Sequence, residues 1–222
     1  MKVTEIFNSI QGETSYAGFP CTFVRLSGCN LRCTYCDTRY AYYRGNHMNV
    51  PEVIRQVDQA GCPLVCITGG EPLLQQEVYP LAGTLLEKGY RVLVETNGSM
   101  PVKLLPEDVV RIVDVKCPGS GMSERVDWNN LGCLYSHDEV KFVVSSRDDY
   151  EWAKSVVKHF DLCDRVTVLV SAAWNRVRLS EIGKWILDDR LNVRLQPQLH
   201  KLIAAGEHGA PLSRQGRAPV FK

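Results

Sequence analysis

The chain has 222 residues, of which 45% are hydrophobic and 23% charged, and a formal net charge of +1. This length and composition are typical of one soluble globular domain with a proper core. The near-neutral charge gives no bulk attraction to nucleic acid or to a membrane. No apolar run reaches the ~20 residues that span a bilayer, and the N-terminus has no signal-peptide core. We therefore expect a cytoplasmic protein with no direct contact to membrane or nucleic acid.

Short apolar runs alternate with helical patterns along most of the chain. In chain order we predict a strand at 21–27, a helix at 51–60, a strand at 64–67, a helix at 78–88, strands at 91–94, 109–115 and 140–144, a helix at 148–160, a strand at 166–170, a helix at 179–187 and a strand at 193–195. Several of these strands are continuously apolar, as parallel strands buried on both faces are. Strands that alternate with helices indicate βα units.

The number of predicted strands and their connections point to one fold class. The chain is short for an eight-unit βα barrel, and the connections after the third and fourth strands leave little room for helices. We therefore predict an α/β fold, a partial, open βα barrel with parallel strands and some reduced crossover helices, whose site lies at the carboxyl ends of the strands. This single domain is expected to cover residues 1–203. Residues 204–222 lack apolar periodicity and are expected to form a mobile C-terminal tail or a cloning remnant.

Three cysteines in one short loop are the strongest chemical signal. Cys29, Cys33 and Cys36 have the spacing C-x3-C-x2-C. Three thiolates fill three corners of a 4Fe–4S cluster and leave one iron open to a small molecule. A closed zinc site needs a fourth ligand, and the nearest candidates, Asp37 and His47, make no familiar zinc pair.

The remaining six cysteines have no assigned role. They are expected to be reduced, mostly buried thiols: Cys21, Cys62, Cys66, Cys117, Cys133 and Cys163. Cys66 lies in an apolar run and is predicted to belong to the core. The x3 gap that separates it from Cys62 leaves a second cluster open as an alternative.

The cysteine loop, with Tyr35 just before its last cysteine, resembles the signature of the radical S-adenosylmethionine enzymes. In that superfamily the open iron of a 4Fe–4S cluster chelates S-adenosylmethionine, and an electron cleaves the sulfonium to give methionine and a 5′-deoxyadenosyl radical. The run Thr-Gly-Gly-Glu-Pro at 68–72 resembles the motif that binds the amino group of S-adenosylmethionine. The resemblance implies a cofactor site at Tyr35, Cys36, Asp37, Gly69, Gly70, Glu71 and Lys116. For Lys116 and Lys141, pairing with barrel carboxylates is an equal alternative.

Further motifs narrow the resemblance to the 7-carboxy-7-deazaguanine synthases, a family of queuosine biosynthesis and hence of a tRNA modification pathway. They lie at residues 9–13, 23–26, 36–38, 67–72, 95–98 and 198–201. This family contracts the ring of 6-carboxy-5,6,7,8-tetrahydropterin to 7-carboxy-7-deazaguanine. The radical abstracts hydrogen and ammonia leaves. Magnesium assists, and S-adenosylmethionine is used catalytically.

The resemblance also implies which residues hold the pterin. The expected substrate site comprises Ile10, Gln11, Gly12, Glu13, Arg25, Thr68, Glu95 and His200. The residue types suit this site, because Gln11 and Thr68 can pair with a pterin edge and Arg25 offers a fork for a carboxylate. Thr38 supplies a hard oxygen for Mg²⁺. Alternatives stay open: Arg25 as a salt bridge at the edge of the core, and His200 as a structural histidine.

We also expect an external flavodoxin- or ferredoxin-like electron donor and a homodimer. Two other classes of function remain. A glycyl-radical activase shares the cysteine motif, but its substrate is a protein loop that needs no Gln-Gly-Glu pocket. A non-enzymatic iron–sulfur or zinc-binding scaffold needs neither the Gly-Gly-Glu-Pro run nor the Glu-Thr-Asn-Gly run.

Overall fold

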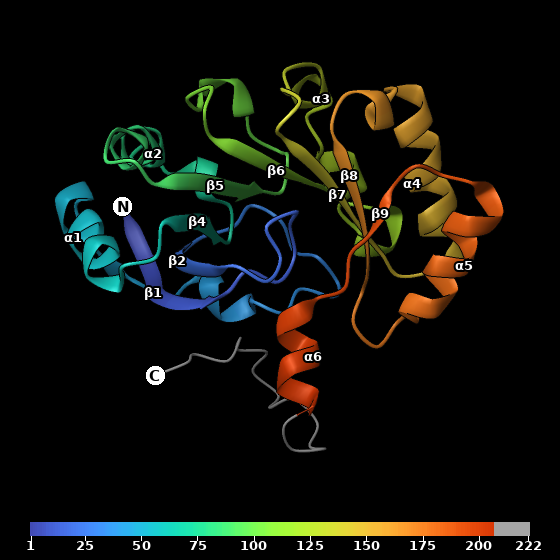
Figure 1. The fold of residues 1–222 in the computed structure, drawn as a ribbon, viewed down its shortest axis with the longest axis horizontal. Helices are drawn as coiled ribbons and strands as arrows, with labels where there is room; N and C mark the ends of the chain where they lie inside the picture. The colour runs from blue at the N-terminus through green and yellow to red at the C-terminus, as the bar shows by residue number, and fades with distance from the viewer. Residues whose placement is uncertain (207–222) are drawn as a thin grey trace.

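The computed structural model describes residues 1–206, and their strands form one curved, open sheet (Figure 1). The order is β3-β1-β2-β4-β5-β6-β7-β8-β9. From β2 to β9 all neighbours are parallel, whereas β1 runs antiparallel to β2 and β3. The strands are β1 (Lys2–Ile10), β2 (Pro20–Leu26), β3 (Asn46–His47), β4 (Leu64–Gly69), β5 (Arg91–Thr96), β6 (Val110–Val115), β7 (Glu139–Val144), β8 (Thr167–Ala172) and β9 (Arg194–Leu195). The predicted partial, open βα barrel is confirmed.

Helices flank the outer side of this arc (Figure 1). They are α1 (Val50–Ala60), α2 (Val78–Glu87), α3 (Asn129–Gly132), α4 (Arg147–His159) and α5 (Leu179–Asp189), whereas α6 (Leu199–Gly206) lies apart from this outer layer (Figure 1). A capping box between Asn49 and Glu52 starts α1, and Gly61 with a φ of +74° ends it. The connection from β5 to β6 contains only a 3-10 turn, and that from β6 to β7 only turns and the four-residue α3. The prediction of reduced crossover helices is therefore confirmed.

The alternation of side chains along each strand separates two layers. Outward-facing residues such as Val24 and Ile67 pack on the helices in the larger apolar cluster. A smaller apolar cluster forms the floor of the barrel interior: Cys21, Leu64, Cys66, Leu93, Val110 and Ile112. The prediction that Cys66 is core is confirmed, since this residue is buried. Every second residue of a strand faces the barrel interior. Nearer the carboxyl ends of the strands, these inward-facing residues are polar: Arg25, Thr68, Glu95, Asp114 and Lys141.

The structure differs from the sequence prediction at both ends of the chain. The predicted strands begin at residue 21, but Lys2–Ile10 also forms a strand, β1, which pairs with all of β2. Its residues escaped prediction because polar side chains such as Glu5 and Asn8 interrupt the apolar pattern. At the other end, residues 204–206 belong to α6, and residues 207–222 of the predicted tail lie outside the described residues. No helix in residues 1–206 has the length and apolar character needed to cross a membrane.

Candidate active site

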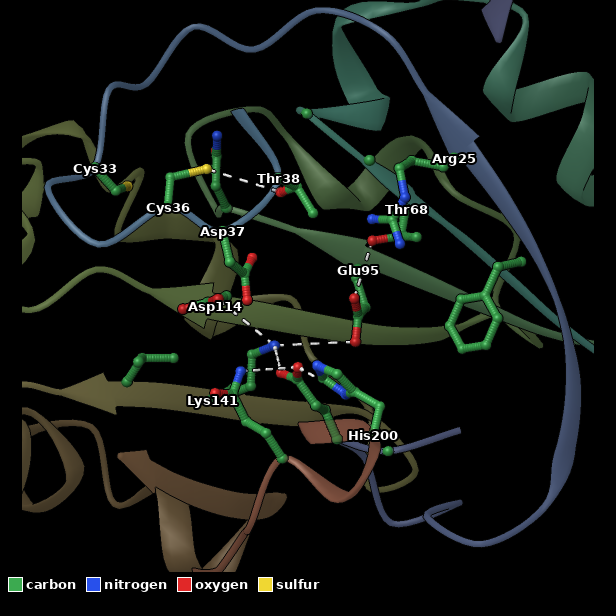
Figure 2. A pocket seen from close by; sticks show the side chains of 18 of the residues that line it. Arg25, Cys33, Cys36, Asp37, Thr38, Thr68, Glu95, Asp114, Lys141 and His200 are labelled. Atoms are coloured by element: carbon green, nitrogen blue, oxygen red, sulfur yellow. Dashed lines mark hydrogen bonds and ion pairs between the residues drawn. The ribbon is translucent and has the colours of Figure 1, made fainter. Parts of the chain in front are cut away.

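A cavity of about 220 Å³ opens inside the arc at the carboxyl ends of the strands (Figure 2). It brings together nearly all predicted site residues: Ile10, Gln11, Gly12, Glu13, Arg25, Cys29, Cys33, Tyr35, Cys36, Asp37, Thr38, Thr68, Gly69, Gly70, Glu95, Lys116 and His200. Parallel strands place their carboxyl ends at one edge, which is why motifs far apart in sequence meet here. Figure 2 shows Cys33 and Cys36 on one side of the cavity and His200 on the other, with Glu95 between them.

The cysteine loop follows β2 and is fastened by backbone hydrogen bonds. The Gly28 amide donates to the Ala41 carbonyl at 2.9 Å, and the Thr34 amide donates to the Ser120 carbonyl at 3.0 Å. Tyr35 is anchored at the far side, where its hydroxyl donates to the Val143 carbonyl at 3.0 Å. The loop therefore spans the top of the sheet from β2 to β7 and holds its three cysteines against the cavity.

The cysteine side chains form a donor set that fits an iron–sulfur cluster. Cys29 Sγ lies 3.4 Å from the Leu31 amide nitrogen and 3.8 Å from Asn97 Nδ2, and N–H groups of this kind tune cluster sulfurs. Burial raises the pKa of the Cys29 and Cys33 thiols. A bound metal reverses that preference, because it coordinates the thiolate. Three half-buried thiols on one wall match the three protein ligands of a 4Fe–4S cluster with one open iron.

Two glycines let the loop after β4 pack against the loop after β2. Gly69 has a φ of +134°, and a Cβ on Gly70 would lie 1.8 Å from the Gly28 carbonyl oxygen. The Gly70 amide donates to the Leu26 carbonyl at 3.1 Å. The sequence suggested that these glycines allow a ligand to approach the backbone. The structure adds a second reason for them, the contact between two chain segments, while both still line the cavity.

Glu71 is the predicted site residue that does not line the cavity. Its carboxylate is fully buried and accepts hydrogen bonds from the Leu73 amide (3.0 Å), the Thr96 hydroxyl (2.8 Å) and the Asn97 amide (2.7 Å). Burial raises its pKa despite these three donors. In this structure Glu71 ties the loop after β4 to the end of β5, behind the wall that Gly69 and Gly70 form.

The amide of Gln11 is oriented by the chain itself. Its Oε1 accepts from the Gly12 amide at 2.8 Å and from the Glu13 amide at 3.1 Å, so its Nε2 faces the other way. That nitrogen is buried and has no hydrogen-bond partner among residues 1–206. Buried donors are rarely left unpaired, and this one borders the cavity. Gln11 is thus suited to donate to an acceptor on a bound ligand.

Arg25 reaches the cavity from β2, where it lies in register with Thr68 of β4. Its Nε donates to Glu5 Oε1 at 2.9 Å, and the guanidinium lies 5.6 Å from the centre of the Phe7 ring. Tyr40 donates to the same Glu5 oxygen at 2.7 Å. The alternative that Arg25 forms a salt bridge is therefore realised. Within residues 1–206 that bridge uses only Nε and leaves both terminal nitrogens of the fork without a partner.

Charged side chains from four parts of the chain meet in the middle of the cavity (Figure 2). Lys141 lies within ion-pair distance of Glu13, Glu95 and Asp114. Thr68 donates to Glu95 Oε2 at 3.0 Å. Three further contacts are the Lys116–Asp114 pair at 2.8 Å, the His200–Glu13 pair at 3.7 Å and the Asp37–Lys201 pair at 2.7 Å. For both lysines the alternative of pairing with barrel carboxylates is realised.

Sequence reasoning missed several cavity residues: Asn97, Asp114, Trp174, Gln198 and Lys201. Asp114 had a usable signal, because it is an acidic residue in the apolar run 110–115. Asn97, Gln198 and Lys201 belong to the motifs at 95–98 and 198–201, which were noticed, but these three residues received no separate role. Trp174 had no comparable signal. It follows β8, and only the curvature of the sheet brings it to the cavity.

Comparison with known proteins places this architecture in a family. The family model described as "Radical SAM superfamily" matches residues 23–163. The chain is 44% identical to a 7-carboxy-7-deazaguanine synthase of Koribacter versatilis, over 91% of this chain and 96% of the relative, and 43% identical to one of Methanospirillum hungatei, over 91% and 85%. Among solved structures it resembles QueE from Escherichia coli, with a TM-score of 0.75 and 21% identity over 89% of this chain and 93% of that chain.

A more distant likeness indicates how widely the fold is shared. The Streptococcus suis protein SuiB, solved with S-adenosylmethionine bound, has a TM-score of 0.55 at 13% identity and matches 86% of this chain. That match covers 51% of SuiB and concerns the fold alone. The assignment therefore depends on the family model and the relatives of high identity. The chain belongs to the radical SAM superfamily and, within it, to the family of the 7-carboxy-7-deazaguanine synthases.

Proposed function

We propose that this chain is a 7-carboxy-7-deazaguanine synthase, a radical S-adenosylmethionine lyase that contracts the ring of 6-carboxy-5,6,7,8-tetrahydropterin with loss of ammonia. The observation that carries the proposal is a single cavity. It joins three cysteines of one loop to Arg25 and to Gln11, whose Nε2 is buried without a partner among residues 1–206. When bound, the 4Fe–4S cluster and S-adenosylmethionine supply the 5′-deoxyadenosyl radical that starts the reaction.

The residues of the chain then act as binding and orienting groups. Gln11 and Thr68 pair with the edge of the pterin, and Arg25 binds the substrate carboxylate through its fork. Glu95 accepts from ring N–H groups, and Gly69 and Gly70 border the methionine part of the cofactor. Holding the substrate beside the cysteine loop fixes which hydrogen the radical meets, so specificity follows from position.

The direct test is turnover under anaerobic conditions. After reconstitution with iron and sulfide, the protein is incubated with the carboxypterin, S-adenosylmethionine, Mg²⁺ and a reductant. We expect 7-carboxy-7-deazaguanine and ammonia to form while S-adenosylmethionine is conserved. A protein that carries an intact cluster and cleaves S-adenosylmethionine, yet forms no product, would refute the proposal. A glycyl radical formed on a partner protein would then favour the activase.

Mg²⁺ is proposed to bind at Thr38. The Thr38 hydroxyl lies 3.7 Å from Cys36 Sγ and borders the cavity, so one protein oxygen is offered there. This fits an ion that keeps several waters and takes few protein ligands.

Thr38→Ala is expected to raise the Mg²⁺ concentration for half-maximal turnover roughly tenfold or more, since even outer-sphere partners of a metal contribute that much to its affinity. The measurement is a Mg²⁺ titration of turnover. Thr34→Ala is the matched control, because Thr34 lies in the same loop as Thr38 but does not border the cavity, and its hydroxyl donates to the carbonyl of Gly119, after β6, at 2.9 Å. An unchanged titration in Thr38→Ala removes Thr38 from the metal site.

Several wider expectations belong to the same proposal. An external flavodoxin- or ferredoxin-like protein supplies the electron, the enzyme is a cytoplasmic homodimer, and nucleic acid is not bound directly. Residues 1–203 form the catalytic domain. The near-neutral net charge of +1 supports the absence of direct nucleic-acid binding, and membership of the radical SAM superfamily supports the need for an electron donor.

A further inference from the structure

Lys141 is the centre of the charged cluster in the cavity, although no motif of the sequence singled it out. It lies on β7, in register with Asp114 of β6, and its side chain is only 6% exposed. Its Nζ lies 3.1 Å from Glu13 Oε2, 3.6 Å from Asp114 Oδ2 and 3.9 Å from Glu95 Oε1. One ammonium therefore joins three carboxylates from three different parts of the chain (Figure 2).

The second oxygen of each neighbouring glutamate is held by another group. Thr68 donates to Glu95 Oε2 at 3.0 Å, and Gln198 donates to Glu13 Oε1 at 3.0 Å. Lys141 contacts the other oxygen of each carboxylate, so both oxygens of Glu13 and of Glu95 have a partner. Asp114 differs, because Lys116 also donates to its Oδ2 at 2.8 Å. Loss of Lys141 would leave Asp114 with a cation, while Glu13 and Glu95 would each lose one.

The positive charge of Lys141 stabilises the ionised form of the Glu13 carboxylate beside it. A buried carboxylate takes up a proton unless a cation or donors favour its ionised form. Burial raises the pKa of Glu13, but Lys141, then His200 and Lys201, outweigh it and hold that pKa well below its usual range. Burial in turn lowers the pKa of Lys141, and Glu95, Glu13 and Asp114 more than reverse this, so the lysine stays charged.

We propose that Lys141 is a positioning residue that orients Glu13 and Glu95, and keeps Glu13 ionised, as acceptors for the N–H donors of the pterin edge. The inference rests on the proposed function, because it names how that substrate is recognised. An ionised carboxylate only accepts hydrogen bonds, whereas a protonated one presents a donor of its own. The amino and ring N–H groups of a pterin are donors, so they select the ionised form.

Other titratable groups also face the two glutamates and set the background of the test. They are Arg25 on β2, Asp114 and Lys116 on β6, Glu139 on β7, His200 and Lys201 on α6, and the buried thiols Cys21 and Cys66 below Glu95. Within residues 1–206, His200 forms an ion pair with Glu13 at 3.7 Å. The binding profile of the wild-type protein contains the contributions of all these groups and is the reference for each variant.

The test is equilibrium binding of the carboxypterin to the protein loaded with cluster and S-adenosylmethionine, between pH 6 and pH 9. The wild-type affinity is expected to vary little. In Lys141→Met the pKa of Glu13 rises because its nearest cation is lost, so affinity should fall at the acid end, by about tenfold per pH unit below the raised pKa, and recover as pH increases. Lys141→Arg keeps the charge and should bind more weakly at every pH without the acid-side loss.

Lys154→Met is the matched control, because Lys154 also pairs with a carboxylate, Asp189 at 3.0 Å, but lies on α4 outside the sheet. Its profile should follow the wild type. A loss in Lys141→Met that is equal at all pH values, or no loss, overturns the inference. If Lys141→Met does not fold, Lys141→Gln is held to the same criterion. Wild-type protein that binds no carboxypterin at any pH refutes the proposed function itself, which separates the two failures.

Discussion

Cys33→Ala is expected to abolish the change that S-adenosylmethionine causes in the paramagnetic signal of the reduced cluster. The three thiols stand on one loop, half-buried at the same cavity wall. A cluster with three protein ligands has one open iron, which is the position that S-adenosylmethionine occupies in this superfamily. In Cys33→Ala two irons lack a protein ligand, so the cluster no longer has a single open iron for S-adenosylmethionine. Its iron content should fall as well.

The measurement is iron and sulfide content together with the signal before and after addition of S-adenosylmethionine. Cys133→Ala is the control, because this cysteine is exposed at the end of α3 and does not border the cavity. It should keep the full iron content and the full response. An intact, responsive cluster in Cys33→Ala would show that the assignment of the ligands is wrong.

The parallel part of the sheet could be predicted because its strands are nearly uninterrupted apolar runs. The run 64–69 is buried almost throughout, so burial on both faces is visible in the residues themselves. β1 lacks that signature: most of its residues are only partly buried, and it pairs antiparallel with β2. Its place in the sheet depends on a partner strand, which no local pattern reveals.

The candidate site divides in the same way. Gln11, Arg25 and Cys33 belong to short motifs that resemble those of the family, and this resemblance was enough to predict them as site residues. The ion pairs between them depend on strand register, and Glu13 and Lys141 are 128 residues apart in sequence. Glu71 shows what a motif does not reveal. Its motif was recognised, but the sequence did not indicate that its side chain is buried and points away from the cavity. Motifs thus predicted which residues gather, and the fold decided which of them touch.

The second large effect concerns Arg25, whose replacement by alanine is expected to weaken carboxypterin binding by roughly 30-fold. Arg25 is held by Glu5 through Nε at 2.9 Å, so the fork is presented to the cavity in a fixed orientation. Truncating one partner of a buried, charge-assisted pair costs ~2–5 kcal/mol, and ~1.4 kcal/mol corresponds to tenfold in affinity. Because Glu5 already offsets part of the charge and the side chain is 13% exposed, we expect the lower end of that range.

The companion variants separate charge from geometry. Arg25→Lys should recover only part of the affinity, because a lysine offers a point charge in place of the two parallel donors of the fork. Arg91→Ala is the control, since Arg91 is exposed at the start of β5, at the opposite end of the barrel from the cavity. Formation of 5′-deoxyadenosine without substrate should continue in Arg25→Ala, because within residues 1–206 the Arg25 side chain contacts Glu5 and Phe7 of β1 and makes no hydrogen bond or ion pair with the cysteine loop. Equal carboxypterin affinity in wild type and Arg25→Ala would refute the carboxylate role, whereas loss of uncoupled cleavage would mean that Arg25 supports the cofactor site instead.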